Sequence, residues 1–469
     1  MSDPYRQAFE KAYSHALGYY DAIDQRNPNA TANAEQLQAA FDGPTPETGT
    51  AAAKIIDQLA AAAEPGLLGT TGPRFFGWVI GASHPAGMAA DWLTSVWGQN
   101  GGSYHVAPAN AVAEQVSSRW LLDLLALPPE CSLGFTTGAT MANFVCLAAA
   151  RNKVLGQADW NVEADGLFGA PPIRVCIGSD AHATVFSALR YLGLGYARVT
   201  RIATDDAGRM LAPALRDALA GHDGPLIVIA QAGQINSGAF DPIGEIADIT
   251  HQHQGWLHVD GAFGLWARAC PARQHLAAGA EKADSWATDG HKWLQTPYDC
   301  GFAIVRDAGA HQNAMTTGAS YLPTATDEVR DPVHYAPELS RRARGFATWA
   351  VIRALGRQGI AAMIERHCLL AQRMANRLML EPGIEILNEV ELNQIVVRFG
   401  TGEPPERRDR WTREVIALTQ SAGVCYVGGA SWKDRWVMRI SVISWPTTEQ
   451  DIDASVDSIV GAWRQVLAR

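Results

Sequence analysis

Five short, almost continuously apolar runs alternate with helix-like segments between about residues 130 and 310. They span residues 133–137, 173–177, 226–230, 255–259 and 301–305. Such runs are typical of strands buried on both faces, and the intervening segments are long enough to form crossover helices. The alternation therefore predicts an α/β domain around a mainly parallel sheet. Because ligands bind beyond the carboxyl ends of such strands, the side chains that follow each run are the first candidates for function.

The rest of the chain divides into a helical beginning and a smaller α/β end. Residues 1–70 are predicted to be helical, and their Ala-rich part has too little apolar surface to fold alone, so it must pack on the main body or on another subunit. Residues 71–345 hold the predicted sheet and end, from residue 311 onward, in a stretch without clear periodicity that suggests a functional loop. In residues 346–469 we expect a long helix, in which Gly359 is the candidate for a break, followed by strands and helices.

Charge and composition exclude several classes of function. The 469 residues carry a formal net charge of −10, with 47% hydrophobic and 18% charged residues, as in ordinary globular proteins. No basic stripe offers a surface for nucleic acid, so nucleic acid is not an expected partner. The first residues lack a signal-peptide pattern, and no apolar run approaches the roughly 18 residues of a membrane span. The seven cysteines form no CxxC pair, which favours buried thiols in a cytoplasmic protein.

Lys292, in residues 284–294 (DSWATDGHKWL), is the strongest candidate for a reactive side chain. The chain has only six lysines, and Lys292 alone lies between aromatic and imidazole side chains with little charge nearby. Burial disfavours an ammonium, so such a lysine has a lowered pKa and can attack a carbonyl as a neutral amine. The carbonyl most often held this way is the aldehyde of pyridoxal 5'-phosphate (PLP), bound as a Schiff base. The alternative is a lysine whose stem packs on Trp293 while its ammonium reaches solvent.

Two further segments carry side chains suited to the same cofactor. In residues 135–143, Gly138 and Ala139 let backbone amides approach an anion at a helix N-terminus, and Thr140 adds a hydroxyl. An ordinary N-cap is the alternative there. His182 opens a helix just after a strand, with a ring face free to stack on an aromatic ring, although a single histidine is more often structural.

Asp260 ends one of the apolar runs, where a buried carboxylate is costly unless it meets a cation or hydrogen-bond donors. A protonated pyridine nitrogen is such a cation, and the carboxylate would keep the ring an electron sink. Ala262 is small enough to let the ring lie against the strand end. Capping of the next helix is the alternative role for this carboxylate. His251, His253 and His258 could suggest a metal, but no carboxylate or cysteine completes the set, so we expect none.

Together these motifs resemble the PLP-dependent group II amino-acid decarboxylases, the family of the aromatic-L-amino-acid and glutamate decarboxylases. The matching motifs are residues 137–140 (TGAT), 179–182 (SDAH), 258–262 (HVDGA) and 291–294 (HKWL). The resemblance implies a fold-type I enzyme with a mainly parallel, seven-stranded large domain, an N-terminal helical segment and a small C-terminal α/β domain. It also implies a homodimer with shared active sites, which would account for the apolar N-terminal helices.

The resemblance assigns a role to each candidate. Lys292 would form the Schiff base, Asp260 would pair with the pyridine nitrogen, and His182 would stack on the ring and face the substrate carboxylate. The remaining cofactor contacts would be Asn236 at the 3-hydroxyl side of the ring, and Ala139, Thr140 and His291 at the phosphate.

A loop tyrosine is the part of the family's site that has no direct counterpart. In the family, this tyrosine reaches in from the partner subunit and protonates the carbanion after CO₂ leaves. Counting back from Arg341 places it near Pro332. A shift of a few residues is tolerated in a loop, so we expect the nearby Tyr335 to act as the proton donor, with His334 and Tyr321 as the other loop candidates.

The expected reaction is decarboxylation of an L-amino acid to its amine. Aromatic or apolar side chains are favoured over glutamate by the expected pocket residues Trp78, Ile80, His84 and His105. Other PLP reactions stay open because positioning decides which bond at the α-carbon breaks. They are transamination, for which Arg439 is a candidate carboxylate partner, aldehyde synthesis and retro-aldol cleavage. A non-catalytic module is disfavoured, since it would not need Lys292 and Asp260 together.

Overall fold

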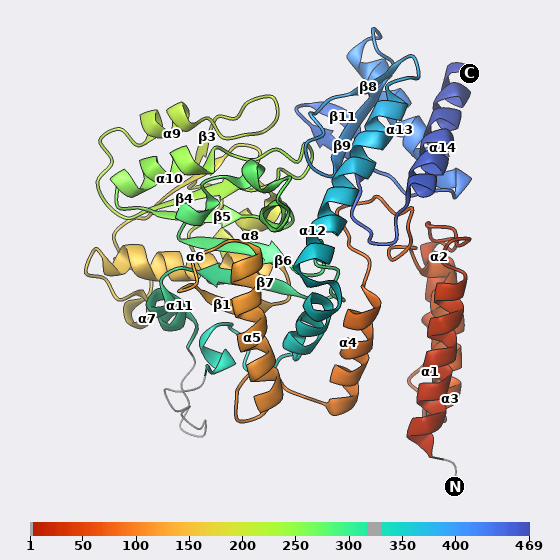
Figure 1. Ribbon diagram of the computed structural model, residues 1–469, viewed down its shortest axis with the longest axis horizontal. Helices are drawn as coiled ribbons and strands as arrows, with labels where there is room; N and C mark the ends of the chain where they lie inside the picture. Colours follow the sequence, from red (N-terminus) through yellow and green to blue (C-terminus); the bar gives the residue numbers. More distant parts are fainter. Residues whose placement is uncertain (1–2, 317–329) are drawn as a thin grey trace.

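The computed structural model describes residues 3–316 and 330–469 and contains two separate sheets, each covered by helices (Figure 1). The larger sheet has seven strands and the smaller has four. This architecture confirms the α/β prediction and the mainly parallel, seven-stranded form of the large sheet. No helix in the described ranges is both long and apolar enough to span a membrane.

The chain begins with three helices, α1 (Pro4–Asp21), α2 (Ala34–Phe41) and α3 (Ala52–Ala63). Asp3 caps α1 by accepting a hydrogen bond from the Tyr5 amide, and Asn33 and Gln36 form a reciprocal capping box on α2. Helices α1 and α3 pack side by side and form an arm beside the main body (Figure 1). The described residues of these three helices include no fully buried side chain, so the arm leaves much of its apolar surface open.

The large sheet has the strand order β1-β7-β6-β5-β4-β2-β3. Its strands are β1 (Ser132–Thr136), β2 (Arg174–Gly178), β3 (Thr200–Ile202), β4 (Leu226–Gln231), β5 (Trp256–Asp260), β6 (Ser285–Asp289) and β7 (Gly301–Val305). Strand β7 is antiparallel to both of its neighbours, because the short connection after β6 holds no crossover helix. The other strands all point the same way, so β1, β2, β5 and β6 end at one edge of the sheet.

Two of these strands were not expected from the sequence. Strand β3 has only three residues, one of them exposed, so it lacks an apolar run. Strand β6 mixes three polar residues with two apolar ones, yet all five are buried. Its Ser285 hydroxyl is hydrogen-bonded to Trp256 on the neighbouring strand, which shows why polar residues are tolerated there.

Helices cover both faces of the large sheet. They are α4 (Pro85–Trp97), α5 (Pro108–Leu124), α6 (Ala139–Gly156), α7 (Val162–Asp165), α8 (Ala183–Tyr191), α9 (Ala212–Ala218), α10 (Ile243–Gln252) and α11 (Ala308–Met315). Side chains of α6, α8 and α11 form the core on one face, and those of α5, α9 and α10 form the core on the other. Helix α11 corrects the expectation that residues from 311 onward lack regular structure.

The C-terminal region holds an antiparallel sheet of order β10-β11-β9-β8. Its elements are α12 (Arg344–Leu378), β8 (Ile384–Ile386), β9 (Gln394–Phe399), α13 (Pro405–Ala422), β10 (Gly428–Trp432), β11 (Arg435–Ser441) and α14 (Glu449–Leu467). Helix α12 breaks at Gly356 (φ 61°, ψ 174°) and not at Gly359, because glycine tolerates this left-handed φ. Val351 in α12 packs in the large core and Leu370 in the small core. A boundary at residue 345 therefore remains a prediction.

Candidate active site

Two neighbouring strands end in buried carboxylates at the same edge of the large sheet. Asp260 ends β5 and Asp289 ends β6, and the parallel register pairs Asp260 with Ala287. Among the described residues, the only hydrogen-bond donor to the Asp260 carboxylate is the Ala262 amide, at 3.3 Å. Burial raises the pKa of Asp260, while the charges of His182 and Lys292 oppose that shift. This carboxylate is therefore prepared to stabilise a cation placed beside it.

Lys292 follows β6 by three residues, and its ammonium lies beside Asp289. Its Nζ lies 3.0 Å from Asp289 Oδ2 and 6.0 Å from the centre of the Phe263 ring. Gly81 lies directly against its backbone, since a Cβ on Gly81 would come within 2.1 Å of the Lys292 carbonyl oxygen. Only glycine permits this approach, so the segment around residue 81 fixes the position of Lys292.

His182 is the N-cap residue of α8, beyond the end of β2. Its Nδ1 is 2.7 Å from the Thr184 hydroxyl and accepts from the Thr184 amide at 3.4 Å. Burial lowers the pKa of His182, and the charge of Asp260 partly opposes this. The imidazole is thus held in place by its own helix.

A close turn connects β1 to the N-terminus of α6 and faces His291. A Cβ on Gly138 would lie 3.0 Å from His291 Cε1, so the glycine leaves room at the helix start. His291 Nδ1 accepts from the Cys300 amide, and its ring stacks on Tyr298 with centroids 4.1 Å apart. Burial lowers the pKa of His291. Thr140 is exposed on the first turn of α6.

The turn after β4 carries Asn236, and it is contacted by Arg439 from the small sheet. Asn236 is buried, and its backbone N–H donates to Gln234 Oε1 at 2.6 Å. Arg439 of β11 donates to the Ile235 carbonyl at 2.7 Å, and its positive charge contributes to lowering the pKa of His182. The small sheet therefore places a cation near the site.

The four expected pocket residues lie in different surroundings. Trp78 is 52% exposed and packs beside Tyr426, with ring centroids 5.2 Å apart. Ile80 is half-buried just before Gly81. His84 lies 5.4 Å from the Trp445 ring and burial lowers its pKa. His105 is exposed between α4 and α5, and within the described ranges no hydrogen bond or ion pair joins it to Lys292.

Tyr335 lies on the side of the molecule formed by α11 and β1. Its hydroxyl accepts from Gln312 Nε2 at 2.8 Å, its carbonyl accepts from His311 at 3.1 Å, and the Arg330 guanidinium lies 4.2 Å from its ring centre. Within the described ranges, no hydrogen bond or ion pair joins Tyr335 to the Lys292 of its own chain. Its role as proton donor remains a prediction, and Tyr321 lies outside the described residues.

Comparison with known proteins identifies the family. A model of the pyridoxal-dependent decarboxylase conserved domain matches residues 34–400. The chain belongs to this family. The decarboxylase is 27% identical over 467 residues to tryptophan decarboxylase 1 of Oryza sativa subsp. japonica, which covers 94% of this chain and 90% of that protein. It is 26% identical over 448 residues to 4-hydroxyphenylacetaldehyde synthase of Rhodiola rosea, with 93% and 90% covered.

A solved structure confirms the fold of the decarboxylase. The crystal structure of Oryza sativa TDC with PLP and tryptamine matches it with a TM-score of 0.92 at 24% identity, over 99% of this chain and 98% of that one. The protein is therefore a PLP-dependent decarboxylase with a fold-type I architecture, as the sequence motifs implied. Its cofactor is PLP.

The described residues of the decarboxylase fit this cofactor at three points and conflict with it at one. Lys292 is available for the aldehyde, and Asp260 is a buried carboxylate without a hydrogen-bonded cation. The turn at Gly138 leaves space at a helix N-terminus, where a phosphate is favoured. However, the Asp289 carboxylate already accepts the hydrogen bond of the Ala139 amide, at 2.6 Å.

No group of three or more potential metal ligands occurs in the described part of the chain.

Two residues of this site were not predicted from the sequence. Gly81 carries no local signal, because its constraint comes from Lys292, far along the chain. Asp289 is also a carboxylate that ends a strand, but it was assigned no role from the sequence because β6 has no apolar run and was not expected as a strand.

Proposed function

We propose that this decarboxylase removes CO₂ from an L-amino acid with an aromatic or apolar side chain and releases the amine. The observation that carries the proposal is the meeting of Lys292, Asp260 and His182 at the edge where β2, β5 and β6 end. The Asp260 pKa is affected by both Lys292 and His182, so the three groups share one electrostatic environment.

Each of these residues has a distinct task. When bound, PLP withdraws the electron pair that remains after a bond at the substrate's α-carbon breaks. We assign to Lys292 the covalent attachment of the cofactor and to Asp260 the stabilisation of the positive charge at the ring nitrogen. His182 supplies a ring face whose Nδ1 is already engaged by Thr184, so its orientation does not depend on the cofactor. Asn236 would contact the 3-hydroxyl side.

The pocket residues favour an aromatic or apolar substrate. Phe75, Trp78 and Tyr426 form an aromatic cluster, with Phe75 stacked on Tyr426 at 4.6 Å. Such a cluster can bury a ring or an alkyl chain, but it offers no cation for a side-chain carboxylate. The relatives named above act on, or produce, aromatic compounds by their names, which supports the same choice. Ile80 and His84 would complete the lining.

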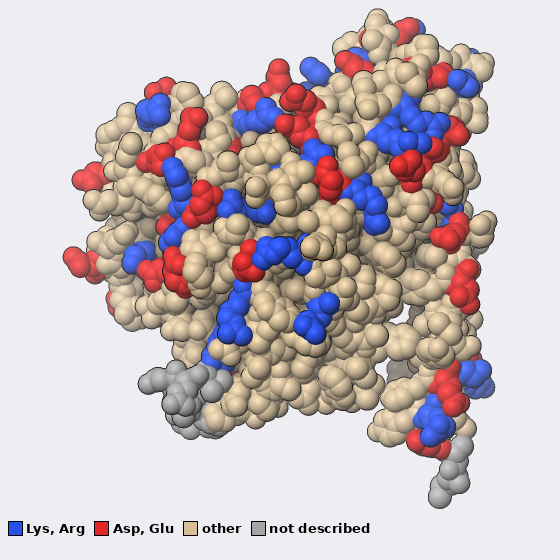
Figure 2. All heavy atoms as spheres, in the orientation of Figure 1, with Lys and Arg blue, Asp and Glu red and all other residues tan. Residues whose placement is uncertain are grey.

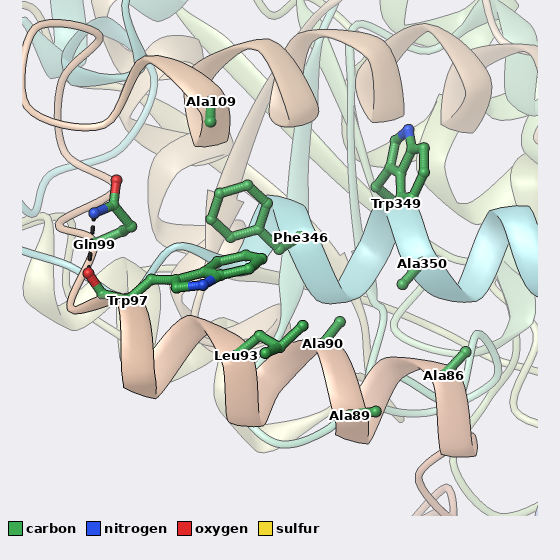
Figure 3. Close-up of a pocket in the computed structure, with 10 residues that line it drawn as sticks. All are labelled: Ala86, Ala89, Ala90, Leu93, Trp97, Gln99, Ala109, Phe346, Trp349 and Ala350. Carbon is green, nitrogen blue, oxygen red and sulfur yellow. Dashed lines mark hydrogen bonds between the residues drawn. The ribbon is translucent and has the colours of Figure 1, made fainter.

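A homodimer with shared active sites is the second part of the proposal. Apolar side chains are exposed along α1, α3 and α4, among them Tyr5, Phe9, Ile55, Leu59 and Trp92, and Figure 2 shows few charged side chains over α4. An apolar cavity of about 730 Å³ opens between α4, α5 and α12 (Figure 3). Surfaces of this kind are normally covered by a partner. A second copy would cover them, and sedimentation of the intact chain would measure the assembly.

The dimer would also explain why Tyr335 and His105 make no hydrogen bond or ion pair with Lys292 of their own chain among the described residues. A loop that crosses to the partner subunit could bring Tyr335 to the partner's site, where its phenol would protonate the α-carbon.

Transamination is a second candidate, and Arg439 favours it. Burial lowers the pKa of Arg439 to about 10, and its Nε has no acceptor among the described residues. A guanidinium that keeps one buried N–H free in this way suits a substrate carboxylate. Aldehyde formation is a further alternative, because one relative is an aldehyde synthase by name.

Product analysis with a panel of L-amino acids tests these alternatives. We expect CO₂ and the amine in equal amounts from aromatic substrates, and no keto acid. In Tyr335→Phe we expect CO₂ release to continue while the ratio of amine to CO₂ falls, because the α-carbon is protonated poorly. Tyr196→Phe, on an exposed turn, is the matched control. An unchanged ratio in Tyr335→Phe would move the proton-donor role to His334 or His182.

A cytoplasmic location remains our proposal for the enzyme. All seven cysteines lie in the described part of the chain, and they are buried and free. Buried thiols without disulfides are typical of a reducing compartment, which supports this location.

A further inference from the structure

Asp289 binds the helix terminus at which the cofactor's phosphate is expected. Its Oδ1 accepts a hydrogen bond from the Ala139 amide at 2.6 Å, at the first residue of the 18-residue helix α6. A Cβ on Gly138 would lie 3.3 Å from the same oxygen, so the carboxylate lies in the space that the glycine leaves open. The positive end of the α6 dipole therefore already stabilises an anion that belongs to the chain.

The other contacts of Asp289 involve the remaining donors of this site. Its Oδ2 lies 3.0 Å from Lys292 Nζ, and its Oδ1 lies 3.5 Å from His291 Nε2. The side chain is only 3% exposed, so solvent does not compete for these contacts. Asp289 thus brings one negative charge to the amide, the imidazole and the ammonium that surround the candidate phosphate position.

The backbone of Asp289 is held as firmly as its side chain. The Trp266 indole donates to the Asp289 carbonyl at 2.9 Å, and the Asp289 amide donates to the Ala262 carbonyl at 3.0 Å. The carboxylate therefore cannot leave through movement of the strand. It can leave the Ala139 amide only by rotating about its own side-chain bonds.

The Ala139 amide cannot donate a full hydrogen bond to the Asp289 carboxylate and to a phosphate at the same time. At a separation of about 4 Å, each pair of like elementary charges changes a binding constant by roughly fivefold even in a water-like dielectric. A phosphate dianion would therefore be disfavoured by roughly tenfold or more, and by more where burial reduces screening. An uncharged side chain of the same shape would remove this electrostatic repulsion between Asp289 and the phosphate.

We propose that Asp289 is an internal competitor of the cofactor's phosphate. In the cofactor-free enzyme its carboxylate binds the Ala139 amide and the Lys292 ammonium, and it must rotate away from the amide before the phosphate is bound. Asp289 thereby sets how tightly the enzyme retains PLP. This inference rests on the proposed placement of the phosphate at Gly138 and Ala139.

The test uses the intact protein after its cofactor has been removed. Inorganic phosphate is the probe, because it cannot react with Lys292, and its affinity is measured by isothermal titration. Asp289→Asn should bind phosphate roughly tenfold or more tightly than the wild type, and Asp289→Ser should do the same through a smaller side chain. Circular dichroism identifies a variant that fails to fold, so that either substitution can carry the test.

Asp241→Asn is the matched control. The Asp241 carboxylate is also buried, and it accepts from the Met210 and Gln231 amides, both at 2.7 Å. The substitution therefore removes the same charge from the same kind of contact, without touching Ala139 or Lys292. Its phosphate affinity should equal that of the wild type. A similar gain in Asp241→Asn would reduce the effect to overall charge and overturn the inference.

Comparison of PLP with pyridoxal, which lacks the phosphate, completes the test. Asp289→Asn should raise the affinity for PLP and leave the affinity for pyridoxal within about twofold of the wild type. Unchanged or weaker phosphate binding in both Asp289 variants would make Asp289 a fixed cap of α6 and overturn the inference. If phosphate fails to compete with PLP in the wild type, the placement of the phosphate itself is wrong, and this result is distinct from the previous one.

Discussion

The carboxylates of Asp260 and Asp289 end adjacent parallel strands, and both are buried, yet they have opposite electrostatic surroundings. Asp260 has one weak donor, the Ala262 amide at 3.3 Å, and burial raises its pKa. Asp289 has the Ala139 amide at 2.6 Å and the Lys292 ammonium at 3.0 Å. Because both carboxylates are buried, burial does not distinguish them. The number of donors does: among the described residues Asp260 has no hydrogen-bonded cation, whereas Asp289 is already paired with Lys292.

The largest expected effect comes from Lys292, which is paired with Asp289 and whose charge also opposes the rise of the Asp260 pKa. Lys292→Ala removes the only amine of this site that can hold the cofactor covalently, so decarboxylation should fall by roughly a thousandfold or more. Borohydride reduction of the wild type, followed by peptide mapping, should place the pyridoxyl group on Lys292. Lys282, which is paired with Asp248 at the surface, is the control, and a label there would contradict the assignment.

Asp260→Asn should show the next largest effect. The uncharged amide cannot hold a positive charge at the ring nitrogen, so kcat should fall roughly a hundredfold, about 2.7 kcal/mol of transition-state stabilisation. Cofactor binding and phosphate affinity should stay close to those of the wild type. That result would separate Asp260 from Asp289, whose substitution is expected to change phosphate affinity. Near-normal kcat in Asp260→Asn would mean that Asp260 only caps the turn after β5.

The smallest expected effect concerns Lys433 of the small sheet, which contacts the segment that carries His182. Lys433, on the turn between β10 and β11, contacts Asp180 Oδ2 at 2.7 Å and the Asp205 carbonyl at 3.0 Å. Asp180 precedes His182 by two residues, so this ion pair positions the segment that carries the imidazole. A partly exposed pair contributes up to about 1 kcal/mol, so Lys433→Met should lower kcat/KM by up to roughly fivefold.

The control for this prediction is Lys433→Arg, which keeps the charge and should restore most of the loss. The visible absorbance of the bound cofactor should shift in Lys433→Met if His182 moves, whereas a purely structural role would lower only the melting temperature. Equal kcat/KM in all three proteins would show that the turn has no influence on His182.

Local sequence patterns were sufficient for the fold class, the cofactor and the three principal candidates. Apolar runs of strand length predicted β1, β2, β4, β5 and β7 at nearly their observed bounds. Lys292, Asp260 and His182 each follow a strand or a strand-like segment, and topology brings such positions together at one edge. The family and the PLP cofactor are confirmed, whereas the individual roles of these residues, Thr140 and Asn236 remain predictions.

The tertiary structure alone decided the features that depend on residues remote in sequence. The Asp289 contact with Ala139 joins positions 150 residues apart, and the constraint on Gly81 comes from Lys292. The position of Tyr335 follows from Gln312 and Arg330, which no loop pattern could reveal. The physical reason is common to all of them: a single sequence records which groups are buried or charged, but partners are assigned only when distant segments pack. Asp260 and Asp289 both end buried strands, and only the approach of α6 and Lys292 to Asp289 gave them different chemistry.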